Sequence, residues 1–115
     1  MSGPIIITLP APPTTNNLFL NIPGRGRVMS RRYKSWRHEA GWDVKSQRPG
    51  RIAGEYEIDI ALPAGLTGDL DNYAKPVSDL IVELGIVDDD RFCKRLSITE
   101  AKTVSGSCII TLRAA

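Results

Sequence analysis

Two groups of aspartates near the middle of the chain have the residue types and spacing that could do chemistry. The segment GDLDNYAK places Asp69 and Asp71 two positions apart, with Lys75 four positions further on. In an extended chain, residues two apart point to the same side, so both carboxylates can address one site while the leucine between them turns into the core. A second acidic group, Asp88-Asp89-Asp90, follows after an apolar segment.

The elements between these groups could bring three of the aspartates together. Apolar residues at i, i+3, i+4 and i+7 predict a helix over about 73–84, which Gly85 ends. A helix of about twelve residues is ~18 Å long, and an extended stretch from Gly85 to Asp90 covers a similar distance at ~3.3 Å per residue. If that stretch runs back antiparallel to the helix, Asp90 returns beside Asp69 and Asp71.

Three neighbouring carboxylates repel one another unless they are protonated or bind a cation. An all-oxygen cluster suits Mg²⁺, with Mn²⁺ as a substitute, and such an ion can stabilise charge on a phosphate. Lys75, one turn along the helix, could contact the same phosphate. The pattern leaves a second interpretation open, in which Asp71 or Asn72 caps the helix and Asp88 to Asp90 form a solvated turn.

The other elements predict an α+β fold with a single domain over 1–115. A helix is expected over 31–47, because Ser30 suits its N-cap, Pro49-Gly50 ends it, and one apolar stripe runs along it. Strands are expected at 5–9, 55–62, 93–101 and 107–113, with a turn at Ser105-Gly106 between the last two. A short strand near 19–22 leads into a basic turn. The order β-α-β-α-β-β predicts a mixed sheet with the two main helices packed on one face.

Charge is divided unevenly along the chain. Residues 1–51 hold nine Lys or Arg and two acidic residues, a net charge of +7, whereas residues 52–115 hold six and eleven, a net charge of −5. The basic half could attract a polyanion or simply present a solvated face. The candidates for contact with the phosphates of such a polyanion are Arg25, Arg27, Arg31, Arg32, Lys34 and Arg37.

Composition excludes several other classes of protein. No apolar run is long enough to cross a membrane, and the first residues lack the pattern of a signal peptide, so we expect a cytoplasmic protein. Cys93 and Cys108 lack the spacing of a zinc site or a disulfide framework, and both are expected to be reduced.

Several segments together resemble the RusA family of Holliday junction resolvases, which is common in bacteria and prophages. LPAPPTTN at 9–16 is similar to the LPxPPxxN opening of that family, and SRRYKSW at 30–36 is similar to its first helix. DLDNYAKP at 69–76 resembles the DxDNxxK signature, and GIVDDD at 85–90 resembles the Gly-apolar-Asp-Asp element that follows it.

The resemblance implies a homodimeric endodeoxyribonuclease that resolves four-way DNA junctions by paired symmetric nicks, using Mg²⁺ and leaving 5′-phosphate and 3′-hydroxyl ends. It assigns catalysis to Asp69, Asp71, Asp90 and Lys75, with Asp89 as a further metal ligand. The chain departs from several family members at 65–68, which is the neutral GLTG rather than a basic cluster. Contact with DNA would then depend more on the region 25–37.

Two other classes of function remain open at this point. One is a module that binds branched DNA without cleaving it, in which the acidic residues only cap and turn. The other is a metal-dependent nuclease with a different substrate range.

Overall fold

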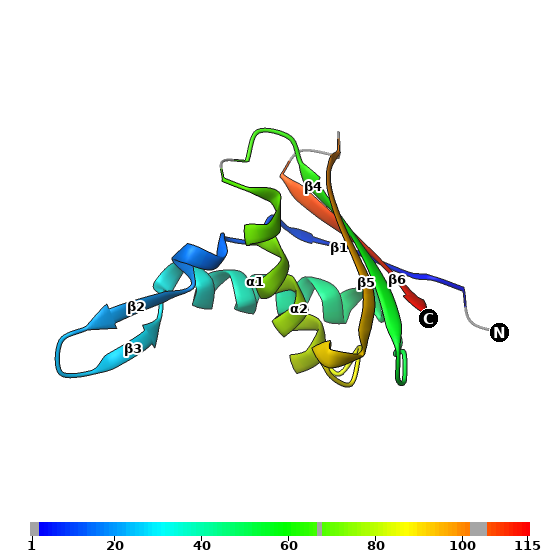
Figure 1. The fold of residues 1–115 in the computed structure, drawn as a ribbon, viewed down its shortest axis with the longest axis horizontal. Coiled ribbons are helices and arrows are strands. Elements are labelled where there is room, and N and C mark those ends of the chain that lie inside the picture. The colour runs from blue at the N-terminus through cyan, green and yellow to red at the C-terminus, as the bar shows by residue number, and fades with distance from the viewer. Residues whose placement is uncertain (1–2, 67, 102–105) are drawn as a thin grey trace.

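The computed structural model describes residues 3–66, 68–101 and 106–115. A four-stranded sheet forms its centre, in the order β1-β6-β4-β5 (Figure 1). The strands are β1 (Ile5–Pro10), β4 (Tyr56–Pro63), β5 (Cys93–Ala101) and β6 (Ser107–Ala114). β4 pairs parallel with β5, while β6 runs antiparallel to both β1 and β4, so the predicted mixed sheet is confirmed.

Two helices cover one face of this sheet, as the sequence predicts (Figure 1). The first, α1 (Arg31–Gln47), starts where the Ser30 side chain accepts a hydrogen bond from the Tyr33 amide, which satisfies an amide at the start of the helix. The second, α2 (Ala74–Glu83), is shorter and follows a 3-10 turn. The sheet face beneath them is buried because buried apolar side chains alternate along β1, β4 and β6.

The apolar stripe of α1 packs into the core at the residues that its spacing indicates. Tyr33, Trp36, Ala40 and Val44 are all buried. The Trp36 indole Nε1 also donates a hydrogen bond to the Pro10 carbonyl oxygen at 2.9 Å, which ties α1 to the end of β1. This contact fixes the start of the following Pro-rich loop, residues 11–17, relative to the helix.

One pair of strands stands outside the predicted order. β2 (Phe19–Ile22) and β3 (Gly26–Met29) pair only with each other and form a separate two-stranded sheet. The sequence predicts one short strand and a basic turn here, but the turn returns the chain as a second strand. Positive φ angles of 78° at Gly24 and 74° at Gly26 make this tight reversal possible.

The cysteines, the last turn and the helix lengths bear on three further predictions. Cys93 and Cys108 are free thiols, as expected. Gly106 turns with a φ of 77°, whereas Ser105, its expected partner in that turn, lies outside the described residues. No helix within the described residues is long and apolar enough to span a membrane.

Candidate functional site

Asp69 and Asp71 lie in the turn that joins β4 to α2. Asp69 is extended, with φ −76° and ψ 146°, and the chain then coils into the 3-10 helix η2 (Leu70–Tyr73). The prediction of an extended chain through both aspartates is therefore wrong beyond Asp69. As a result, Leu70 does not enter the core but is 42% exposed, and the buried ring of Tyr73 anchors the turn instead.

Both carboxylates are exposed. The N-cap of η2 is Asp69 and that of α2 is Tyr73, and neither makes a side-chain capping hydrogen bond. Within the described residues, no ion pair involves Asp69 or Asp71. The interpretation of Asp71 or Asn72 as a helix cap is therefore not supported.

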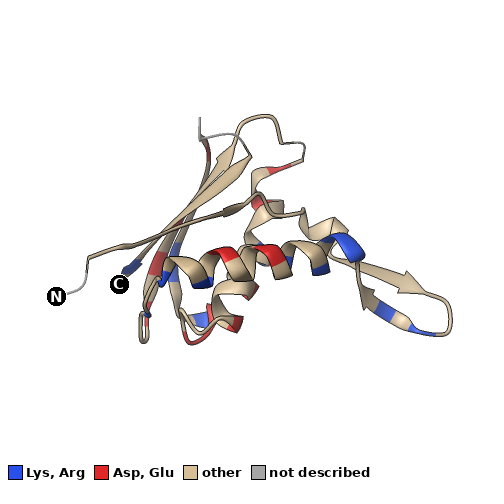
Figure 2. Cartoon of the chain, turned by 180° about the vertical axis from the view of Figure 1, so that it is seen from behind, with Lys and Arg blue, Asp and Glu red and all other residues tan. Residues whose placement is uncertain are grey.

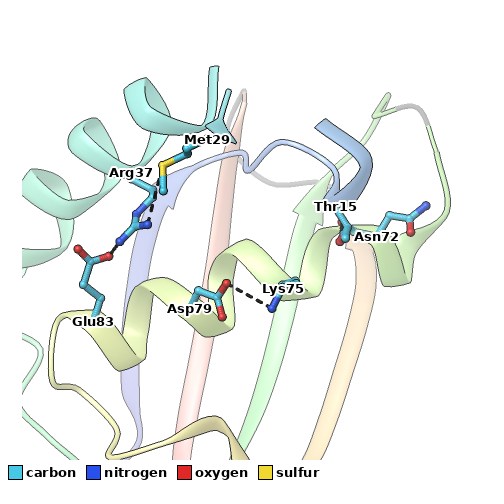
Figure 3. Close-up of polar contacts among 7 residues, drawn as sticks. All are labelled: Thr15, Met29, Arg37, Asn72, Lys75, Asp79 and Glu83. Atoms are coloured by element: carbon cyan, nitrogen blue, oxygen red, sulfur yellow. Dashed lines mark hydrogen bonds and ion pairs between the residues drawn. The ribbon is translucent and has the colours of Figure 1, made fainter. Parts of the chain in front are cut away.

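The Pro-rich loop braces this turn from a distant part of the chain. The Thr15 hydroxyl donates a hydrogen bond to the Asn72 carbonyl oxygen at 2.8 Å (Figure 3). A methyl group of Thr14 lies 3.6 Å from where a Cβ would stand at Gly68, whose φ of 93° favours glycine. Sequence reasoning missed Thr14 and Thr15 as positioning residues, because nothing local indicates which distant turn they contact.

Lys75 lies on the first turn of α2 and is about half exposed. Its Nζ is 3.5 Å from a carboxylate oxygen of Asp79, one turn further along the helix (Figure 3). Such an exposed i,i+4 pair is weak, so Lys75 remains able to reach a phosphate. Asp79 was not among the predicted site residues, although its spacing from Lys75 indicates the pairing.

The second acidic group is held by contacts of its own at the opposite end of α2. Asp88 forms an ion pair with Arg51 and accepts a hydrogen bond from the Gly54 amide at 3.1 Å. Asp89 caps the 3-10 helix η3 (Asp90–Phe92) by accepting a hydrogen bond from the Arg91 amide at 3.0 Å. That backbone hydrogen bond from Arg91, followed by a side-chain hydrogen bond with Asp90, holds the pKa of Asp89 below its usual value. The turn interpretation is thus correct for Asp88 and Asp89.

Asp89 and Asp90 line a shallow acidic hollow together with the second half of α2. Its other lining residues are Arg37, Asp79, Val82 and Glu83. Asp89 and Asp90 come just before β5, whose first residue pairs with the first residue of β4. Asp69 instead follows the end of β4, so the hollow and the Asp69–Asp71 turn lie toward opposite ends of that strand.

The prediction that Asp90 returns to the N-terminus of α2 within one chain is therefore wrong. The segment after Gly85 does not run back along the helix, because the amides of Ile86 and Val87 bond to the Ile81 carbonyl and Val87 forms a bridge with Ile52. The return is made later, by β5.

One chain alone does not fit a three-carboxylate metal site. Among residues 3–66, 68–101 and 106–115, no three His, Cys, Asp or Glu side chains are placed to hold one metal ion. The single chain offers Asp69 and Asp71 at one end of α2, and Asp89 and Asp90 at the other.

Five of the six predicted DNA-contacting side chains are exposed on the β2–β3 hairpin and the first turn of α1. Figure 2 shows these basic positions at one end of the molecule. They are Arg25, Arg27, Arg31, Arg32 and Lys34.

Arg37 differs from the other five because it links structural elements. It forms an ion pair with Glu83 of α2 and donates to the Met29 sulfur at 4.0 Å (Figure 3). Its guanidinium also lies over the Tyr33 ring, 5.4 Å from the ring centroid. Its side chain is 26% exposed. Arg37 therefore joins the hairpin and the two helices.

The family model of the endodeoxyribonuclease RusA matches residues 10–113. The chain belongs to the RusA endodeoxyribonuclease family. A search of curated proteins gave no match.

Membership of the RusA family gives the class of reaction and of substrate. RusA-family proteins are endodeoxyribonucleases associated with the resolution of Holliday junctions. The match includes the η2 turn, α2, η3 and the basic region, so every candidate site residue falls within the matched range.

Proposed function

We propose that this RusA-family chain is a Mg²⁺-dependent Holliday junction resolvase acting in DNA recombination and repair. It would make paired symmetric nicks that leave 5′-phosphate and 3′-hydroxyl ends, with Mn²⁺ as a possible substitute ion. The observation that carries the proposal is the braced η2 turn, which presents the carboxylates of Asp69 and Asp71 without using either as a cap or ion-pair partner. Lys75 lies on the next turn and suits contact with a phosphate.

We further propose that a homodimer completes each metal site. In a two-fold dimer, a contact between one end of α2 and the opposite end in the partner occurs twice, so two equivalent sites form together. Asp69 and Asp71 of one chain would then share Mg²⁺ with Asp90 from the other chain, with Asp89 as a further ligand. Carboxylate oxygens are suitable ligands for this ion, and two sites suit two opposed strands.

A second candidate function is favoured by one observation. Because no three metal-ligand side chains gather among the residues that the structure describes, the protein would act as a branched-DNA-binding module without cleavage if no dimer completes the site. Junction binding without any cleavage in Mg²⁺ or Mn²⁺ identifies this case.

Substitution of one carboxylate tests the catalytic assignment. Asp71→Asn should lower junction cleavage by at least about a hundredfold, because it removes a charged ligand, and should leave junction affinity within about twofold. Glu39→Gln, at an exposed acidic residue of α1, is the matched control and should cleave normally. Normal cleavage by Asp71→Asn would contradict the assignment.

Mixed dimers test whether each site is shared between chains. Asp71→Asn and Asp90→Asn homodimers should both be inactive, but a dimer of one chain of each kind has one intact site and one doubly altered site. It should therefore nick a supercoiled plasmid that bears a cruciform without linearising it. If each site lay within one chain, the mixed dimer would be as inactive as its parents.

A further inference from the structure

The β2–β3 hairpin projects from the body of the protein and is fixed only at its base (Figure 1). At that base Leu18 is fully buried, the Ser30 amide bonds to the Leu18 carbonyl at 2.8 Å, and the Ser30 hydroxyl bonds to the Asn17 carbonyl at 2.6 Å. We call residues 19–29 the arm.

The two faces of the arm have different surroundings. Phe19 lies opposite Met29 in the register, and this face packs on α1, with the Phe19 and Tyr33 ring centroids 5.9 Å apart. Since side chains alternate along a strand, Leu20 and Ile22, with Val28 opposite Leu20, lie on the other face. Leu20 is 53% exposed, and Ile22 and Val28 are partly exposed. Two-stranded sheets are marginal in water alone, so this apolar face suits a partner that covers it.

Charge indicates which partner that is. Residues 1–38 contain no Asp or Glu but six Lys or Arg, and Arg25 and Arg27 stand at the end of the arm. Arg27, opposite Asn21 in the register, lies on the Phe19 face of the arm, with its guanidinium 4.1 Å from the centroid of the Phe19 ring. An arm that carries only positive charge, with Arg25 at its tip and an apolar strip on the face opposite to Arg27, fits a polyanion that also offers flat apolar groups. DNA has both, in its phosphates and its bases.

We propose that the arm is the element that distinguishes branched DNA from linear duplex. Arg25 and Arg27 contact phosphates near the branch point, while Leu20, Ile22 and Val28 pack against base pairs that end there. In a linear duplex each base pair is stacked on both sides, and opening a step for an apolar side chain costs a few kcal/mol. At a branch point, the last base pair of each DNA helix can have one face exposed without that cost. The inference rests on the proposed function, because it takes branched DNA as the substrate.

Two variants at exposed leucines test the apolar contact. Leu20→Ser should weaken binding to a four-way junction about tenfold, since it removes the burial of one leucine side chain, and leave binding to a linear duplex of the same sequence within about twofold. Leu96→Ser, at a leucine of β5 that is 42% exposed, is the matched control and should alter neither affinity. Affinities are measured without divalent cation, so that no cleavage occurs.

The basic tip is tested separately by salt dependence. Arg25→Ala combined with Arg27→Ala should weaken binding to both DNAs and reduce the slope of log affinity against log salt by about two. The junction preference should persist in this variant, because the apolar face is intact.

Three results would overturn or separate the proposals. An unchanged junction-to-duplex affinity ratio in Leu20→Ser would show that the arm does not read the branch, while cleavage of junctions by the wild type would keep the proposed function. A change from dimer to monomer in Leu20→Ser, measured by analytical ultracentrifugation, would show that a second copy covers the face and would overturn the arm proposal. A wild type that neither prefers nor cleaves junctions would refute the proposed function itself.

Discussion

At the scale of single residues, the aspartates between β4 and β5 differ in what their carboxylates already do. Asp88 and Asp89 each accept a backbone hydrogen bond that shapes the chain before β5. Asp69 and Asp71 are on a turn whose shape is set by other groups, namely the Thr15 hydroxyl and the buried Tyr73 ring. Their negative charge is therefore available for a ligand rather than for the fold.

The two cysteines provide a residue-scale test of the core. Burial raises the pKa of the Cys108 thiol to about 12, so this thiol stays protonated at pH 8 and does not react, because the thiolate is the nucleophile. Cys93 is only partly buried. Alkylation of the native protein at pH 8 should modify one thiol per chain readily, and the second only after denaturation.

Cys93→Ser is the control for this measurement, and it should remove the readily modified thiol. If the native Cys93→Ser protein reacted as fast as an unfolded thiol, Cys108 would not be buried as described.

At the scale of elements, local sequence patterns correctly predicted the helices and strands that neighbouring residues determine. The cap at Ser30 and the apolar stripe defined α1 correctly, and alternation defined β4. The β2–β3 pairing was missed, because the same short apolar run reads as a single strand when its partner is unknown. The predicted course of the chain after Gly85 was wrong for a similar reason. It is set by contacts of Ile86 and Val87 with Ile81 and Ile52, which the local sequence does not indicate.

The same limit applies to the candidate site. Residue types and spacing placed Asp69 and Asp71 just before the second helix and Lys75 in its first turn, and the structure agrees, although the chain coils into η2 after Asp69. They could not indicate that Asp90 lies at the other end of α2, since this depends on which strand makes the return. They also gave no sign that Thr15 braces the turn.

The start of α1 is the element that should supply most of the nonspecific attraction to DNA. Arg31→Ala combined with Arg32→Ala should weaken junction binding and reduce the salt slope by about two, because each exposed guanidinium displaces about one counterion from the phosphates. Equilibrium binding at several salt concentrations measures this slope.

A double variant on the sheet is the matched control. Arg95→Ala with Arg113→Ala removes the same charge from the two β-strands near Asp59 and should leave the salt slope nearly unchanged. An unchanged slope in the α1 variant would exclude those two arginines from DNA contact.

At the scale of the whole molecule, one end carries basic residues without acidic ones, whereas basic and acidic residues are mixed over the rest (Figure 2). The arm and the start of α1 form a basic end, while the acidic residues of α2 and η3 lie away from it (Figure 2). A long, uneven shape of 51 × 30 × 26 Å results largely from the projecting arm. This arrangement suits a protein that meets DNA along an extended surface and cuts at fixed points beneath it.

The central claim is that this chain cleaves branched DNA in a reaction that requires Mg²⁺, and one measurement tests it directly. A labelled four-way junction and a linear duplex of the same sequence are incubated with the purified protein, with and without Mg²⁺. The account predicts paired nicks at symmetric positions in the junction, only with Mg²⁺, and an intact duplex. A junction that is bound but never cut, or a duplex cut as readily as the junction, would contradict it.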